Sequence, residues 1–120
     1  MKGNEFMNAK DFKEAVDSYS KSIELNPQEA ATYSNRALAY IRLKEFARAI
    51  EDANESLKIN PNYLKAYHRR AKAYFSLNKF EIAIKDFQHI LEVEPENKEA
   101  IVDLKLARDK LNERLKSSGA

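Results

Sequence analysis

The sequence predicts an all-α fold, an α-solenoid in which pairs of helices repeat and a last helix covers the open end of the stack. The first observation is an internal period of 34 residues, at which Pro27, Pro61 and Pro95 recur. The second is helical spacing within each period, as at Tyr33, Ala37 and Tyr40, which lie at i, i+4 and i+7. With 120 residues, 43% hydrophobic and 33% charged, the chain has the size of one soluble domain. We therefore expect one domain whose successive helix pairs bury a continuous core.

Similar residue types return at several other positions of the period, which indicates that every repeat packs in the same way. Small residues form the columns Gly3, Ala37, Ala71 and Ala15, Ala49, Ala83, and aromatic residues form the columns Phe6, Tyr40, Tyr74 and Phe12, Phe46, Phe80. Small side chains allow a neighbouring aromatic ring to pack directly against a helix backbone.

The same register gives the boundaries of the elements. Repeat one covers residues 1–29, repeat two 30–63 and repeat three 64–97, each a pair of helices ended by its proline. Short connections such as "LKEF" and "LNKF" require the two helices of a pair to be antiparallel. In this register repeat one would start five residues before Met1, so its first helix is expected to be short.

Residues 98–116 break the period but keep an apolar stripe, which predicts a capping helix for the open end of the stack. The stripe consists of Ala100, Ile101, Leu104, Ala107, Leu111 and Leu115. Residues 117–120 are expected to form a disordered tail.

Composition excludes several functions. The 21 Lys and Arg balance 19 Asp and Glu, so net charge does not predict a nucleic-acid or membrane partner. The chain has no cysteine and no run near the roughly 18 apolar residues of a membrane helix, and we expect a monomer in the cytoplasm or nucleus. Only two glycines occur, so there is no phosphate-binding loop, and His68 and His89 have no partner at metal-ligand spacing. We expect no enzymatic activity, no cofactor and no metal.

The cations of the third repeat are the strongest functional signal. In the stretch "YLKAYHRRAKAYF", Tyr67, Ala71 and Tyr74 are expected on the packed face, and Lys65, Arg69 and Lys72 form an adjacent stripe at i, i+4 and i+7. This stripe is expected to face the groove. Taken singly, each cation could simply be solvated, and Arg70 is expected to be solvated or to pair across helices. The acids Glu51, Asp52 and Glu55 are expected on solvated faces of second helices.

Asparagines hold related positions in the earlier repeats. Asn35 lies in the middle of a helix, where asparagine is about 0.5–0.7 kcal/mol less favourable than alanine, and Asn4 stands at the position of Lys72 in repeat one. Asn35 could bond to a neighbouring helix or its own backbone. Alternatively, ammonium, guanidinium and amide donors that converge in one groove can bind the two carboxylates of a chain that ends in aspartate.

A 34-residue helix-turn-helix unit with Gly or Ala, an aromatic residue, Ala and a terminal Pro resembles the tetratricopeptide repeat. The resemblance covers Met1 to about Asn97. It implies a right-handed superhelix with a concave groove lined by the first helix of each repeat.

Asn4, Asn35 in "YSNRALAY", and Lys65 and Arg69 in "LKAYHRR" further resemble the two-carboxylate clamp of co-chaperone tetratricopeptide domains. The resemblance implies that the groove binds the C-terminal Glu-Glu-Val-Asp of cytosolic heat-shock chaperones of the seventy or ninety kilodalton class. The predicted peptide-binding residues are Asn4, Asn35, Leu38, Ile41, Arg42, Lys65, His68, Arg69 and Lys72. The fifth clamp residue of the family, a lysine four residues before Asn4, would fall ahead of Met1, and Lys2 does not replace it.

Two other functions use helical repeats of this kind. Helical repeats also bind RNA, but most aromatic residues here belong to packing columns, and the cations are concentrated in one repeat instead of recurring in each. A repeat scaffold that binds an internal or helical segment of another protein remains the alternative.

Overall fold

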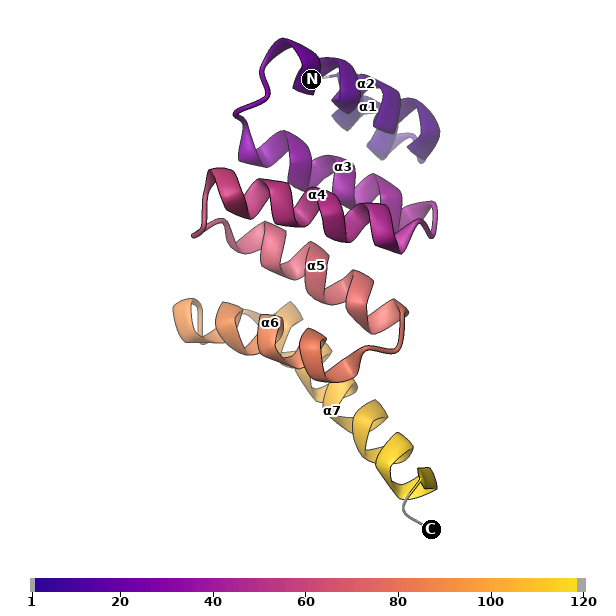
Figure 1. Ribbon diagram of the computed structural model, residues 1–120, viewed down its shortest axis with the longest axis vertical. Helices are drawn as coiled ribbons and strands as arrows, with labels where there is room; N and C mark the ends of the chain where they lie inside the picture. Colours follow the sequence, from indigo (N-terminus) through magenta and orange to yellow (C-terminus); the bar gives the residue numbers. More distant parts are fainter. Residues whose placement is uncertain (1, 119–120) are drawn as a thin grey trace.

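The computed structural model describes residues 2–118 and shows seven α-helices and no strand within that range. The helices are α1 (Lys2–Asn8), α2 (Phe12–Leu25), α3 (Ala30–Arg42), α4 (Phe46–Ile59), α5 (Leu64–Ser76), α6 (Phe80–Val93) and α7 (Lys98–Ser118). They form antiparallel pairs stacked along the longest axis of a 52 × 27 × 22 Å molecule, and α7 extends from the far end (Figure 1). The predicted all-α solenoid is confirmed. None of the helices in residues 2–118 has the length and apolar character needed to cross a bilayer.

The turn inside each pair has the same backbone conformation. Lys10, Lys44 and Asn78, which are 34 residues apart, adopt left-handed φ angles of 60°, 61° and 62°. In the second pair, the backbone N–H of Lys44 donates to the carbonyl of Ile41 at 3.0 Å, and that of Glu45 donates to Tyr40 at 2.8 Å. This pattern ends a helix with a residue in the left-handed region, where lysine is disfavoured relative to asparagine or glycine.

Alanines of the periodic columns form the contacts between helices. Ala37, Ala49 and Ala73 are fully buried in one cluster that joins the second and third repeats. In the first pair, a Cβ added to Gly3 would lie 2.4 Å from the ring of Tyr19, so only glycine allows α1 and α2 to approach this closely.

Helix α7 covers the end of the stack, as predicted. Ala100, Leu104 and Ala107 are buried against Phe87 and Ile90 of α6 in a single cluster. The helix therefore adds a third layer to the core of the last repeat.

Two details of the predicted cap were wrong. Ile101 and Leu115 are exposed, because the buried stripe of α7 is narrower than predicted. It consists of Ala100, Leu104 and Ala107. Helix α7 also continues to Ser118, two residues beyond the predicted boundary at Lys116. The rest of the predicted tail, residues 119–120, lies outside the described residues.

Arginine–aspartate pairs connect the two helices of a repeat. Arg36 binds Asp52 through two hydrogen bonds of 2.7 Å, and Arg70 binds Asp86 in the same way at 2.9 and 2.8 Å. Arg70 thus pairs across helices, which was one of the two expectations for it, the other being a solvated side chain. The expectation that Asp52 is solvated was wrong, because its carboxylate is buried against Arg36.

Candidate functional site

Two adjoining hollows lie along α5, the helix that carries the predicted cations. The larger has a volume of about 350 Å³ and is lined by Leu64, Lys65, His68, Arg69, Ile90, Glu94, Asn97 and Glu99. The smaller, of about 180 Å³, is lined by Leu38, Ile41, Arg42, His68, Arg69, Lys72 and Glu99. We call the two together the groove.

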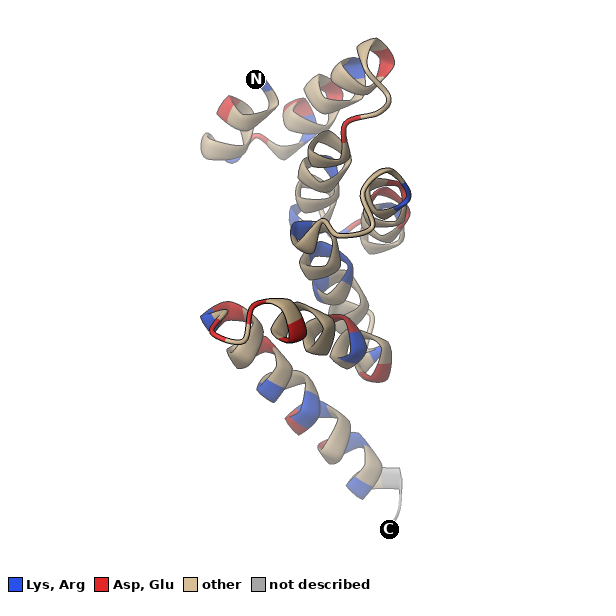
Figure 2. Cartoon of the chain, turned by 90° about the vertical axis from the view of Figure 1, so that its left-hand side faces the viewer, with Lys and Arg blue, Asp and Glu red and all other residues tan. Residues whose placement is uncertain are grey.

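The structure brings seven of the nine predicted site residues to the groove, all from α3 and α5. Lys65, Arg69 and Lys72 reach the groove together because residues at i, i+4 and i+7 lie on the same side of a helix. Figure 2 shows Lys and Arg along the middle of the stack and Asp and Glu at the turn that precedes α7.

Arg69 is the most unusual of these side chains. It borders both hollows, yet its Nε atom is buried and has no hydrogen-bond partner among the described residues. Burial lowers the pKa of its guanidinium, against the opposing influence of Glu99. A buried donor without a partner is costly, so Arg69 is held in an unfavourable environment at the edge of both hollows.

The two asparagines of the predicted clamp lie apart from the hollows. Asn4 on α1 accepts a 2.6 Å hydrogen bond from the hydroxyl of Tyr19, so its carbonyl oxygen is already occupied. Burial raises the pKa of that tyrosine above its ordinary value, against the opposing charge of Arg69. Asn35 is half-buried on α3, and no residue in 2–118 hydrogen bonds to its side chain. The alternative interpretation of Asn35, a bond to a neighbouring helix or to its own backbone, is therefore not found among the described residues.

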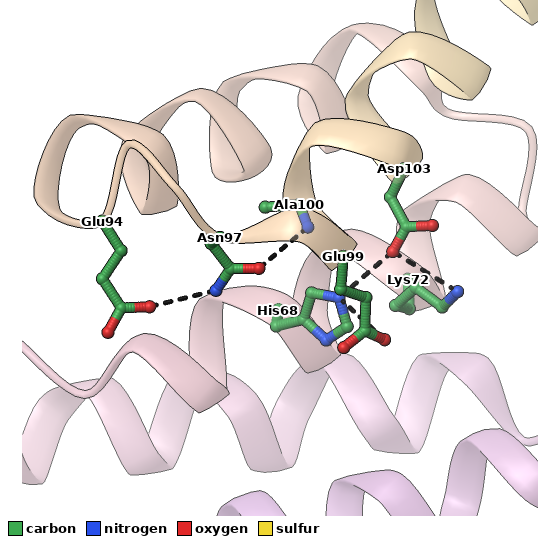
Figure 3. Close-up of polar contacts among 7 residues, drawn as sticks. All are labelled: His68, Lys72, Glu94, Asn97, Glu99, Ala100 and Asp103. Atoms are coloured by element: carbon green, nitrogen blue, oxygen red, sulfur yellow. Dashed lines mark hydrogen bonds and ion pairs between the residues drawn. The ribbon is translucent and has the colours of Figure 1, made fainter.

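Helix α7 contributes acids to the groove, which the sequence analysis missed. Nε2 of His68 lies 3.1 Å from an oxygen of Asp103 and 3.5 Å from one of Glu99, and Lys72 lies 3.6 Å from Asp103 (Figure 3). Glu99 and Asp103 are one turn apart on α7 and flank the buried Ala100, which was the available signal that they face α5.

The start of α7 is fixed by Asn97, which positions these acids. Its side-chain oxygen accepts a hydrogen bond from the backbone N–H of Ala100 at 3.0 Å, and its amide nitrogen donates to Glu94 at 3.0 Å (Figure 3). An asparagine in this role is a common helix N-cap.

His68, Glu99 and Asp103 are also the described residues that could hold a metal ion, since their ligand atoms lie within 4.8 Å of one another. Sequence spacing missed this group because its members come from two helices. Lys72 already neutralises Asp103 from 3.6 Å, so the geometry is accounted for by ion pairs. His89 is half-exposed and packs on the ring of Tyr67, 4.2 Å away, as a surface residue of α6.

Comparison with known families identifies the class of protein that this fold and groove define. The family model described as tetratricopeptide repeat matches residues 30–63 and 64–97, and a second, described as TPR repeat, matches residues 3–44. The chain belongs to the tetratricopeptide repeat family.

Solved structures of this family are similar over nearly the whole chain. The first TPR domain of human RPAP3 is 40% identical with a TM-score of 0.93, covering 97% of this chain and 91% of that one. The first TPR of Spaghetti (RPAP3), bound to the HSP90 peptide SRMEEVD, is 41% identical with a TM-score of 0.90, covering 92% and 88%. The second TPR domain of human RPAP3, in complex with the HSP70 peptide SGPTIEEVD, is 30% identical with a TM-score of 0.85, covering 89% of each chain.

Curated relatives match over a shorter segment. Serine/threonine-protein phosphatase 5 of Homo sapiens is 51% identical over 39 residues, which is 32% of this chain and 8% of that enzyme. The chain therefore spans only a small part of the length of such relatives.

Proposed function

We propose that the groove binds the acidic C-terminus of a heat-shock chaperone, a peptide ending in Glu-Glu-Val-Asp, and that the domain is a co-chaperone or adaptor module. The observation that carries the proposal is Arg69, whose buried Nε has no hydrogen-bond partner among the described residues at the junction of the two hollows. A carboxylate is the acceptor best suited to it, because charge-assisted bonds to guanidinium are short and strong.

Neighbouring side chains give each part of the peptide a partner. Lys65 is exposed in the larger hollow and can pair with a second carboxylate. Asn35 offers an amide without a partner in residues 2–118, and Leu38 and Ile41 offer apolar surface for the upstream residues. Asn4 joins the site if its amide nitrogen reaches the ligand while its oxygen stays bonded to Tyr19.

The remaining groove residues set the electrostatic surroundings. Arg42 is exposed at the rim of the smaller hollow, and His68 and Lys72 are held by the acids of α7. Solved structures of similar domains with the peptides SRMEEVD and SGPTIEEVD support the proposal.

We further infer that the domain acts by binding and not by catalysis, since the groove offers ion pairs and apolar surface for a peptide. A chaperone partner of this kind would place the domain in the cytoplasm. The alternative is a scaffold that holds an internal or helical segment of another protein in the same groove.

Calorimetric titration with SRMEEVD and with its C-terminally amidated form tests the proposal. The free acid should bind at least about tenfold more tightly, a difference of about 1.4 kcal/mol, because amidation removes one of the two terminal carboxylates. Equal affinity for acid and amide would favour the internal-segment scaffold.

A further inference from the structure

Glu99 occupies an unexpected position for a groove that binds an acidic peptide. It lines both hollows together with Arg69, and its charge acts on that guanidinium. We propose that Glu99 forms a subsite for a basic side chain upstream of the acidic terminus, so that the groove selects peptides that carry Arg or Lys there. This inference rests on the proposed function.

The two acids of α7 differ in their availability. Asp103 is 13% exposed and lies within 3.6 Å of both His68 and Lys72, so its charge is already compensated. Glu99 is 68% exposed, and its contact with His68 is longer, at 3.5 Å (Figure 3). Of the two, Glu99 is therefore the acid that can turn toward a ligand.

The path of the peptide brings it to Glu99 in either direction. Lys65 lies in the larger hollow and Lys72 in the smaller, while Arg69 and Glu99 line both. A peptide whose terminal carboxylate is bound at Arg69 and whose preceding residues occupy either hollow therefore lies in a space that Glu99 also lines.

Charge gives this position a selective effect. Glu99 repels the glutamates of a bound acidic peptide and so lowers the affinity for that peptide. A basic side chain on the peptide offsets this repulsion by forming an ion pair with Glu99. Of the two peptides found with similar domains, SRMEEVD carries an arginine and SGPTIEEVD carries no basic residue. The subsite therefore favours the first sequence.

The test is a thermodynamic cycle between the acid and the peptide arginine. Wild type and Glu99→Gln are titrated at low salt with SRMEEVD, with SAMEEVD, and with SMREEVD, in which the arginine is moved by one position. Wild type should bind at least one arginine peptide about three- to fivefold more tightly than SAMEEVD, as expected for an exposed ion pair. In Glu99→Gln this preference should vanish. SAMEEVD should also bind Glu99→Gln more tightly than it binds wild type.

Glu96→Gln is the matched control, because Glu96 is exposed three residues earlier and lines neither hollow of the groove. It should keep the wild-type preference. If arginine is favoured equally in wild type and Glu99→Gln, or is favoured in neither, the subsite is excluded while acid-dependent binding of SRMEEVD stands. If amidated and free SRMEEVD bind wild type equally, the proposed function fails and the subsite fails with it.

Discussion

At the scale of single residues, the adjacent arginines Arg69 and Arg70 of α5 have opposite surroundings. Arg70 has both of its carboxylate-facing nitrogens bound to Asp86 and a third nitrogen bound to Asn54. Arg69 has an unpartnered Nε within the described residues and faces the groove. One guanidinium stabilises the helix pair, and the other is the one that we propose binds the peptide.

Replacing each arginine with methionine should therefore give opposite results, because methionine keeps most of the apolar stem. Arg69→Met should weaken SRMEEVD binding at least about tenfold and leave the free energy of unfolding unchanged or up to about 1 kcal/mol higher, since a desolvated charge is removed. Arg70→Met should lower the free energy of unfolding by about 2–3 kcal/mol, because Asp86 is left buried without its partner. Calorimetry and urea unfolding measure the two effects; normal binding by Arg69→Met would remove Arg69 from the site.

At the scale of elements, the turn inside each helix pair contains a residue with positive φ, and the residue type at that position does not always favour this conformation. Lys44 between α3 and α4 holds φ at 61°, whereas Asn78 fills the equivalent place between α5 and α6 with a residue that tolerates this conformation. The turn of the second repeat is thus strained relative to that of the third.

Lys44→Gly should raise the free energy of unfolding by about 0.5–1 kcal/mol, because glycine adopts positive φ without a Cβ clash. The control is Lys44→Gln, which removes the same charge but keeps a Cβ at the φ of 61°. Thermal unfolding of both variants provides the comparison. A similar gain in both would mean that loss of the lysine charge, and not the backbone, is responsible.

The sequence predicted the helices well because the period, the prolines and the alanine columns are all local signals. It did not predict the turn conformation at Lys44, since lysine carries no preference for positive φ. The pairing of Asp52 was also missed, although arginine and aspartate both recur at the 34-residue period, at Arg36 and Arg70 and at Asp52 and Asp86. Glu99 was missed because its place depends on how α7 docks against α5, which its own sequence does not specify.

At the scale of the whole molecule, the core is a series of small clusters instead of one large interior. The cluster of the first repeat includes Ala39 of α3, that of the second includes Ala73 of α5, and that of the third includes Leu104 of α7. Each layer thus depends on the next one along the stack. Stability is expected to be the sum of the layers and of the contacts between neighbours.

Removing side-chain volume from the last layer tests this view. Leu104→Ala leaves a cavity among Phe87, Ile90 and the α7 alanines and should lower the free energy of unfolding by about 2–3 kcal/mol, with a Tm lower by roughly 10 °C. Leu106→Ala is the control, because that side chain is 44% exposed and should cost well under 1 kcal/mol. In Leu104→Ala, amide hydrogen exchange should accelerate most in α6 and α7 and least in α2 and α3, since the damaged layer contacts only its neighbours. An equal loss of protection from α2 to α7 would show instead that the stack opens as one unit, and that its layers are not independent contributors to stability.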